Sequence, residues 1–340
     1  MFESLLRAWD GEHAVVRYDA PSGAWIFVCI HSTVLGPAGG GTRMRVYPAP
    51  ADGLADALRL SRAMTQKMAA AGVPHGGGKA VLAVPALPEG DARRALLHRY
   101  GELVTSLGGS YRTAGDMNVS PADLDVVAER CPWVYGTTGR GGDSGRGTAR
   151  GVLHGIRAAV EHAFGSPDLA GRTVLVQGLG AVGAPLARAL ADEGAEVLVT
   201  DVDEERVAAS GLEGVSAGDA TGVECDVYAP CAVGGTLSAE TIPRLRCRIV
   251  AGSANNQLAT PEDAERLHER GILYAPDYVV NAGGVVQLIG LEDEGWDDAE
   301  LERGLARIGG SLRELFAGAA AGGITPVAAA ERLVAERLAR

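Results

Sequence analysis

Lysine is almost absent from this chain of 340 residues, in which Lys67 and Lys79 are the only two lysines. Lysine and arginine together number 31 against 43 aspartate and glutamate residues, which gives a formal net charge of −12. A chain of this sign is poorly suited to polyphosphate or to an anionic membrane surface. We therefore expect neither nucleic acid nor a membrane among its partners.

Long apolar runs, a secretory leader and paired cysteines are missing as well. No stretch approaches the ~20 apolar residues that cross a bilayer, and the first residues, MFESLLRAWDGEH, lack the basic start and apolar core of a secretory signal. The five cysteines are odd in number, widely spaced and never arranged as Cys-x-x-Cys. This usage favours neither a disulfide framework nor a zinc site, and a cytoplasmic protein without a metal is the expectation.

Glycine, in contrast, is abundant, with 48 residues in a chain that is 46% hydrophobic and 22% charged. Such a composition is typical of a folded protein with many tight turns, and the length predicts two domains of ~150 residues each. The stretch 136–148 is so rich in glycine that we expect a linker without regular structure there. It lacks the Gly-Lys-Ser/Thr ending of a phosphate-binding P-loop.

The pattern of apolar residues differs on the two sides of this stretch. Before it, β-rich runs at 14–18 and 24–30 predict a hairpin. Helices are expected over 54–71, over 91–107 with Asp91 as N-cap, and from Ser120. After it, short strands alternate with helices from 173 to 251, and helices at 297–316 and 326–340 close the chain. The expected fold class is α/β, with a mixed sheet in the first half and a Rossmann-type, doubly wound parallel sheet in the second.

A dinucleotide-binding fingerprint opens the second half. The strand 173–177 leads directly into a Gly-x-Gly-x-x-Gly turn, and the turn opens a helix. The first glycine permits the tight turn, the second lets backbone N–H groups approach a pyrophosphate, and the third lets helix and strand pack closely. A carboxylate at the end of the next strand is placed for the adenosine ribose, and it repels a 2′-phosphate, so NAD is favoured over NADP. The predicted cofactor residues are Gly178, Leu179, Gly180, Ala181, Val182, Gly183 and Asp201.

The two lysines are candidates for chemistry because arginine serves everywhere else. Lysine, unlike arginine, can lose its proton when burial lowers its pKa. Lys79 follows three glycines, which lets backbone and ligand come close. Asp116, after an expected short strand at 111–115, could complete an acid–base pair with Lys79. The structural alternatives are a solvated charge for each lysine and a turn or helix-cap acid for Asp116.

Several segments together resemble one enzyme family, the glutamate, leucine, phenylalanine and valine dehydrogenases. They run in the same order along almost the whole chain, with a particular likeness to phenylalanine dehydrogenases. The resemblance implies a substrate-binding, catalytic and oligomerisation domain over 1–135, a Rossmann NAD-binding domain over 136–317, and a C-terminal helix over 318–340 that returns toward the first domain. It also implies a homo-oligomer. The segments are LGPAGGGTRM (35–44), MTQKMAAAG (64–72), GGGK (76–79), Asp116, VQGLGAVG (176–183), APCAVGG (229–235), AGSANN (251–256) and YAPDYVVNAGG (274–284).

The resemblance also implies a role for individual residues. Lys67 would hold the substrate carboxylate, Lys79 would activate water and Asp116 would move protons. Hydride would leave Cα of the neutral amine, water would attack the resulting iminium, and the carbinolamine would collapse to a 2-oxo acid and ammonia. Further residues carried over from the family are Gly41 and Asn255 at the amino group, and Thr148, Ala232 and Asn256 at the cofactor.

The preferred amino acid is the most open point. On the family's pattern the side-chain pocket is lined by Gly39, Ala114, Val285 and Leu288, which are uncharged and disfavour glutamate. Gly39 leaves room for a ring and Leu288 resembles the phenylalanine enzymes, whereas Ala114 and Val285 favour smaller substrates. We expect L-phenylalanine, with leucine or valine as the alternative.

Two other functions compete with this interpretation. A 2-hydroxy acid dehydrogenase would need a histidine paired with an acid, and His31 and His75 match no such arrangement in the sequence. A non-catalytic NAD-sensing protein would be expected to lack part of the lysine–aspartate set, which is complete here.

Overall fold

The computed structural model describes residues 2–140 and 144–339, which form two compact units. Of the described residues, unit 1 holds 2–140 and Leu291–Gly295, and unit 2 holds 144–290 and 296–339. The domain boundary at 135/136 that the resemblance implies stays a prediction, and no sequence feature indicated the return of 291–295 to unit 1. Residues 141–143 of the expected linker lie outside the described residues. The return of 318–340 toward the first domain stays a prediction.

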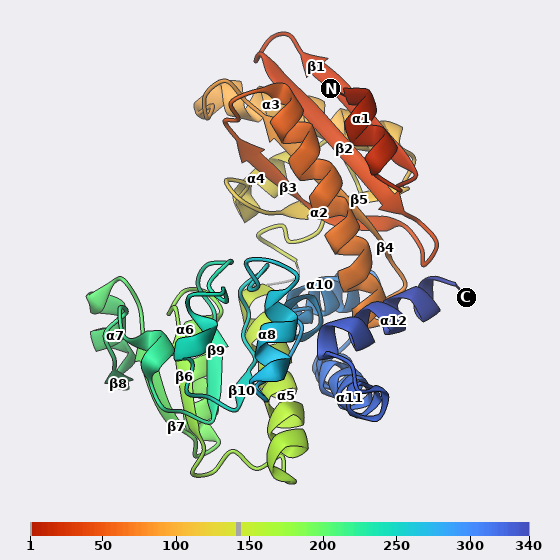
Figure 1. The fold of residues 1–340 in the computed structure, drawn as a ribbon. Helices are drawn as coiled ribbons and strands as arrows, with labels where there is room; N and C mark the ends of the chain where they lie inside the picture. Colours follow the sequence, from red (N-terminus) through yellow and green to blue (C-terminus); the bar gives the residue numbers. More distant parts are fainter. Residues whose placement is uncertain (1, 141–143, 340) are drawn as a thin grey trace. The chain divides into compact units, whose positions relative to one another are not determined.

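Unit 1 is built on a mixed sheet, here called sheet A (Figure 1). Its hairpin strands pair antiparallel, as expected, and β4 pairs antiparallel with β2 but parallel with β3. β5 extends the parallel part beside β3. The order is β1-β2-β4-β3-β5, and the strands are β1 (His13–Asp19), β2 (Ala24–Ser32), β3 (Ala38–Arg45), β4 (Gly76–Ala83) and β5 (Tyr111–Gly115).

Helices cover both faces of sheet A. Ala80 and Leu82 of β4 pack with α3 (Gly90–Ser106) and α4 (Pro121–Ala128) on one face. Val81 and Ala83 pack on the other face with α2 (Pro50–Ala71), and α1 (Phe2–Ala8) precedes the sheet. Because alternate residues of a strand face opposite ways, Lys79 points to the α2 face.

Glycine is required where these layers touch. A Cβ on Gly77 would overlap the backbone nitrogen of Thr65 in α2, and one on Gly40 would overlap the carbonyl oxygen of Gly78 in the neighbouring strand. The glycine-rich runs 39–41 and 76–78, for which no regular element was expected, belong to two central strands, because only glycine lets helix and strands approach this closely.

The N-terminal ends of the helices follow the sequence signals with one exception. Ser120 caps α4 with its hydroxyl, which accepts from Asp123 N, as expected. The expected cap of the preceding helix is wrong, because Glu89 and not Asp91 is the N-cap residue of α3. Asp91 instead lies in the first helical turn, where its charge still favours the helix dipole.

Unit 2 is a parallel, doubly wound sheet, here called sheet B, with the order β11-β10-β9-β6-β7-β8 (Figure 1). Chain order reverses at β6, so the crevice between the carboxyl ends of β6 and β9 is the expected ligand position. The fold class expected from sequence is confirmed in both units. The strands are β6 (Thr173–Gln177), β7 (Glu196–Thr200), β8 (Glu213–Gly214), β9 (Val227–Pro230), β10 (Ile249–Val250) and β11 (Leu273–Tyr274).

The helices of unit 2 include one that begins inside the expected linker. α5 spans Ser144–Phe164, so residues 144–148 are helical and the expectation of irregular backbone there is wrong. Gly147 and Gly151 of this helix lie against Gly283, where larger side chains would not fit. The other helices are α6 (Gly183–Asp192), α7 (Glu204–Ser210), α8 (Asp263–Glu269), α9 (Asp277–Val280), α10 (Gly283–Glu292), α11 (Asp298–Gly322) and α12 (Pro326–Leu338), with short 3₁₀ turns at Ala220–Gly222 and Ile242–Arg244.

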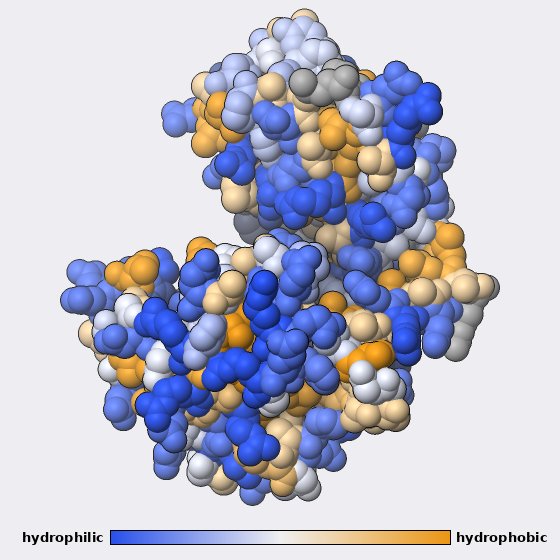
Figure 2. All heavy atoms as spheres, viewed as in Figure 1, coloured by the Kyte–Doolittle hydropathy of each residue, from blue (hydrophilic) through white to orange (hydrophobic). Residues whose placement is uncertain are grey.

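The surface carries no broad apolar region on the face shown in Figure 2, where hydrophilic residues predominate on each unit and hydrophobic ones form small, separate groups. Among the described residues, no helix combines the length and apolarity that crossing a membrane requires.

Candidate active site

Lys79 and Asp116 form a close ion pair in unit 1. The Nζ atom of Lys79, in β4, lies 2.8 Å from Oδ2 of Asp116, which follows β5. The lysine side chain is 8% exposed and the aspartate side chain 28%. Between the two strands runs β3, whose Gly41 has no side chain to separate the charges. The two residues that the sequence suggested as an acid–base pair therefore lie in contact, and their catalytic role stays a prediction.

Burial and charge act against each other on this pair. Burial lowers the pKa of Lys79, and the carboxylate of Asp116 offsets part of that effect. Burial alone would raise the pKa of Asp116, but the charges of Lys79 and Arg43 outweigh it and lower that pKa.

Arg43 is a member of this cluster that sequence reasoning missed. Its Nε donates to Asp116 Oδ2 at 2.9 Å, and its Nη1 donates to Asp56 Oδ2 at the same distance. The Tyr47 hydroxyl also donates to Asp56 Oδ2, at 2.7 Å. Asp116 is thus held by two cations, one of which can release a proton. The sequence did contain a signal for Arg43, because a residue two positions after Gly41 faces the same side of the strand.

The remaining unit 1 candidates lie on the same side of sheet A. Lys67 is a partly buried residue of α2, the helix that covers this face. Gly39 and Gly41 are buried, and Gly41 is paired in register with the partly exposed Ala114. Gly39, Gly41 and Ala114 form a floor of small residues beside the ion pair, which we call the glycine floor.

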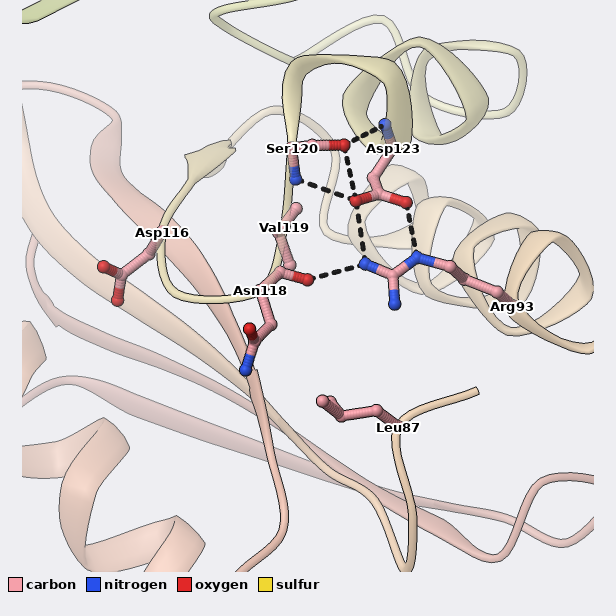
Figure 3. Close-up of a pocket in the computed structure, with 7 residues that line it drawn as sticks. All are labelled: Leu87, Arg93, Asp116, Asn118, Val119, Ser120 and Asp123. Carbon is pink, nitrogen blue, oxygen red and sulfur yellow. Dashed lines mark hydrogen bonds and ion pairs between the residues drawn. The ribbon is translucent and has the colours of Figure 1, made fainter. Parts of the chain in front are cut away.

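Asp116 also borders a pocket of about 430 Å³ that is formed entirely by unit 1 (Figure 3). In this view it lies across the pocket from the paired side chains of Arg93 and Asp123. Asn118, in left-handed backbone with φ 58°, turns the chain between Asp116 and Ser120 and donates its Nδ2 to Met44 O at 3.0 Å. The carboxylate of Asp116 points away from this pocket in Figure 3, and the side chain is 28% exposed, whereas Lys79 is buried.

The glycine turn of unit 2 has the geometry that dinucleotide binding requires. Gly178 has φ 96°, and a Cβ there would lie 2.7 Å from the Cβ of Ala232 after β9. Gly180 has open space around it, whereas a Cβ on Gly183 would overlap the carbonyl oxygen of Gly178. Leu179 is buried and Ala181 and Val182 lead into α6. The turn therefore leaves a cradle at Gly180 that a pyrophosphate can approach.

Asp201, at the end of β7, lies directly beside this turn. Its Oδ2 accepts from the backbone nitrogen of Leu179 at 2.6 Å, and its Oδ1 accepts from Asp203 N at 2.9 Å. These backbone hydrogen bonds lower the pKa of Asp201 and keep it ionised. Arg206 lies 3.9 Å away, as a weak counter-charge. A fixed carboxylate here suits two ribose hydroxyls and opposes a 2′-phosphate.

The other cofactor candidates lie in loops that follow neighbouring strands. Asn255 and Asn256 are exposed after β10, and Asn256 adopts φ 53° and accepts from Gly235 N at 2.7 Å. Asn281 is a buried residue that sequence reasoning did not single out, although it lies in one of the quoted segments. Its Nδ2 donates to Asn255 Oδ1 at 2.9 Å and so fixes the orientation of that amide.

The remaining candidates of unit 2 lie on two helices, α5 and α10. Thr148 donates its hydroxyl to Ser144 O at 2.9 Å in the first turn of α5. Its Oγ1 would lie 2.7 Å from a Cβ on Gly284, at the start of α10. On α10, Val285 and Leu288 are partly exposed between buried neighbours. They lie three residues apart and hence on one helix face, which suits residues that line a pocket.

Two histidines gain acidic partners that the sequence did not indicate. Nε2 of His75 lies 2.9 Å from Asp293 Oδ2, and Nε2 of His31 lies 3.0 Å from Asp10 Oδ1. Among the described residues, no cluster of histidine, cysteine or acidic side chains is arranged to hold a metal ion.

Comparison with known proteins gives one consistent answer. Residues 22–134 match the family model described as Glu/Leu/Phe/Val dehydrogenase, dimerisation domain, and residues 199–295 match Glutamate/Leucine/Phenylalanine/Valine dehydrogenase. The chain belongs to this family. It is 41% identical over 340 residues to leucine dehydrogenase of Geobacillus stearothermophilus, covering 98% of this chain and 92% of that protein. It is 46% identical over 338 residues to valine dehydrogenase of Streptomyces albus, covering 96% and 92%.

A solved structure of L-tryptophan dehydrogenase from Nostoc punctiforme matches with a TM-score of 0.87 and 36% identity, over 99% of this chain and 98% of that one. The family expected from sequence is thus confirmed, and the chain is an NAD-dependent amino acid dehydrogenase. The expected likeness to phenylalanine dehydrogenases is less well supported, because the relatives above fit the branched-chain alternative better.

Proposed function

We propose that this dehydrogenase catalyses the reversible oxidative deamination of a branched-chain L-amino acid, valine or leucine, to its 2-oxo acid and ammonia. The observation that carries the proposal is the buried Lys79–Asp116 pair, 2.8 Å apart, beside a floor of glycine and alanine. A short amino acid can lie on such a floor with its reacting carbon close to a base and a proton carrier.

Each unit 1 residue has a role that its surroundings support. Lys67 binds the substrate carboxylate from α2. Asp116, in contact with both Lys79 and solvent, takes the proton of the substrate ammonium. Lys79, whose pKa burial lowers, gives up its proton more readily than a surface lysine and activates the water that attacks Cα. Asp116 then returns a proton to nitrogen, and ammonia leaves.

The residues proposed to hold the dinucleotide cofactor lie in unit 2. The open space at Gly180 accommodates a pyrophosphate, Asp201 accepts hydrogen bonds from the ribose hydroxyls, and Thr148, Ala232 and Asn256 contact the rest of the cofactor in this proposal. NAD bound there supplies the hydride acceptor. Asn255, held by Asn281, contacts the substrate amino group.

The glycine floor argues for a short side chain in place of the ring expected from sequence. The space that Gly39 leaves free is filled by Met68, whose Cε lies 2.8 Å from the position of a Cβ on Gly39. His75 Cδ2 lies 3.8 Å from the same point. A phenyl ring would have to push the flexible end of Met68 aside and would then approach the His75 ring.

The test is a panel of L-amino acids with NAD at alkaline pH, read by NADH absorbance. We expect kcat/KM for L-valine or L-leucine to exceed that for L-phenylalanine and L-tryptophan by at least ~10-fold. A preference for either aromatic amino acid contradicts the branched-chain assignment. No turnover of any amino acid favours a non-catalytic NAD-sensing role.

We also propose a homo-oligomer formed through unit 1, in line with the description of the family model that matches residues 22–134. Light scattering of the purified protein measures its mass, and a mass of 35.0 kDa, that of one chain, would contradict it.

A further inference from the structure

A polar cluster, buried at His75 and Tyr135, lies beside Gly39 at one end of the glycine floor. It consists of His75, just before β4, Arg112 of β5, Tyr135, and Asp293 of the segment Leu291–Gly295. All four belong to unit 1, and His75 is 3% and Tyr135 6% exposed. None of the chemistry proposed above uses them.

Asp293 is the centre of the cluster. Its Oδ2 accepts from the Tyr135 hydroxyl, its Oδ1 accepts from Arg112 Nη1, and Nε2 of His75 lies 2.9 Å from Oδ2. Arg112 also donates to the Tyr135 hydroxyl at 3.0 Å and lies over its ring, 5.8 Å from the centroid. The imidazole therefore has one orientation, because a ring flip would break its contacts with Asp293 and Tyr135.

That orientation presents the Cδ2 edge of His75 to Gly39. Gly39 is paired in register with Gly77 and Arg112, whereas Gly41 is paired with Ala114 and lies beside Lys79. The two glycines are two residues apart on β3, so their levels are ~6.6 Å apart along the strand. His75 thus lies at Gly39, two residues along β3 from Gly41 and the Lys79–Asp116 ion pair, on the same face of the sheet.

The surroundings of His75 favour an uncharged imidazole ring. Burial lowers the pKa of His75, and Arg112 adds to this effect, while Asp293 and Glu294 oppose it. The neutral ring donates from Nε2 to Asp293, and Arg112 and Asp293 balance each other. A neutral, fixed ring edge bounds an apolar subsite without attracting a charged substrate group.

We propose that His75 is a specificity-determining residue, which ends the side-chain subsite at Gly39, and that Asp293 is a positioning residue that holds the ring there. This inference rests on the proposed function, because it takes the substrate side chain to lie along the glycine floor toward Gly39. A valine or leucine side chain ends before the ring, whereas a phenylalanine side chain displaces the flexible end of Met68, which lies nearer to Gly39, and then meets the fixed imidazole.

The experiment compares kcat/KM for L-valine and L-phenylalanine in wild type, His75→Ala and His75→Leu. In His75→Ala we expect the phenylalanine-to-valine ratio to rise at least tenfold, through a lower KM for phenylalanine. His75→Leu restores bulk without polarity, so the wild-type ratio should return. Asp293→Asn should raise the ratio about threefold, because the ring is less firmly held. The matched control is His268→Ala, an exposed histidine of α8, which should leave the ratio unchanged.

The outcomes separate this inference from the function it rests on. A ratio in His75→Ala within twofold of wild type, with valine still a substrate, overturns the assignment of His75 and leaves the branched-chain function intact. Equal losses for both substrates indicate a purely structural role and also overturn it. If His75→Ala does not fold, His75→Asn, which shortens the side chain and keeps a donor for Asp293, must raise the ratio or the proposal fails. A wild-type enzyme that turns over no amino acid refutes the proposed function itself.

Discussion

Lys79 and Asp116 meet across an intervening strand. The order β4-β3-β5 places β3 between them, yet Nζ and Oδ2 are 2.8 Å apart. A Cβ on Gly41 of β3 would lie 3.2 Å from Nζ and 3.0 Å from the Cβ of Asp116. The ion pair therefore depends on the missing side chain of Gly41 as much as on its own charges.

Replacement of Lys79 tests whether its proton or only its charge is needed. Lys79→Arg keeps a cation that cannot be deprotonated at working pH, and Lys79→Ala removes both. We expect both variants to lose ~10²–10⁴-fold in kcat/KM, which is the usual contribution of a general acid or base. NADH binding, followed by fluorescence, should be unchanged because its residues lie in unit 2. Substantial activity in Lys79→Arg would reduce the residue to an electrostatic anchor.

The pH dependence of wild type follows from the environment of Lys79. Burial lowers its pKa, and Asp116 offsets part of that effect. The neutral amine is therefore formed at lower pH than in a free lysine, whose pKa is ~10.4. We expect kcat/KM for deamination to rise toward alkaline pH with an apparent pKa below that value. A profile that is flat between neutral pH and ~10 would contradict a titrating lysine.

The sequence predicted most elements, the fold class and the family, and the failures have physical causes. The fingerprint at Gly178–Gly183 and the isolated lysines were readable because a local spacing or a rare residue type carries the signal. β3 and β4 were missed because their glycines are dictated by Thr65 and by a neighbouring carbonyl group, which are contacts distant in sequence. The room expected at Gly39 stays a prediction, and the nearness of Met68 from α2 is a contact that the sequence could not indicate. The cluster around Asp293 joins residues up to about 220 positions apart, so no local pattern could indicate it.

The close approach of α2 to β4 can be tested with a matched pair of glycine substitutions. Gly77→Ala places a Cβ on the backbone of Thr65, and neither backbone can move freely in the packed interior. We expect a loss of about 3 kcal/mol or more in the free energy of unfolding of unit 1. Gly310→Ala, in α11, meets no atom within 4 Å and should stabilise by about 0.5–1 kcal/mol. Urea denaturation followed by circular dichroism measures both. A tolerated Gly77→Ala would show that the helix and strand are not tightly packed.

The choice of NAD over NADP is assigned to Asp201. Asp201→Ser removes the charge that opposes a 2′-phosphate, while Arg206 keeps its nearer ion pair with Asp203, 3.2 Å away. We expect KM for NAD to rise about tenfold, since one hydrogen bond to a charged group contributes ~1.5–3 kcal/mol, and KM for NADP to fall. Asp192→Asn is the control, because this exposed carboxylate lies at the opposite end of α6 from the glycine turn. An unchanged NAD-to-NADP ratio in Asp201→Ser would mean that another group selects the cofactor.

Protonation of Asp123 is expected to lower the free energy of unfolding as the pH falls below about 4. Burial alone would raise its pKa, but hydrogen bonds from Arg93, with distances of 2.6 and 2.8 Å, and from Ser120 lower it to about 2 (Figure 3). Because the folded pKa is below the unfolded value of ~3.9, the stabilisation is fully present above pH ~4 and is lost as the pH falls toward 2. It amounts to about 2 kcal/mol at neutral pH.

Asp123→Asn should therefore be less stable than wild type by about 2 kcal/mol at pH 7, and the difference should shrink below pH 4. Asp91→Asn removes one exposed carboxylate from the first turn of α3 and should change stability by less than ~0.5 kcal/mol. Denaturant titrations at pH 7, 5, 4 and 3 give the difference between each variant and wild type, so general acid effects cancel. A difference for Asp123→Asn that stays constant down to pH 3 would mean that the Arg93 contact does not depend on the charge of Asp123.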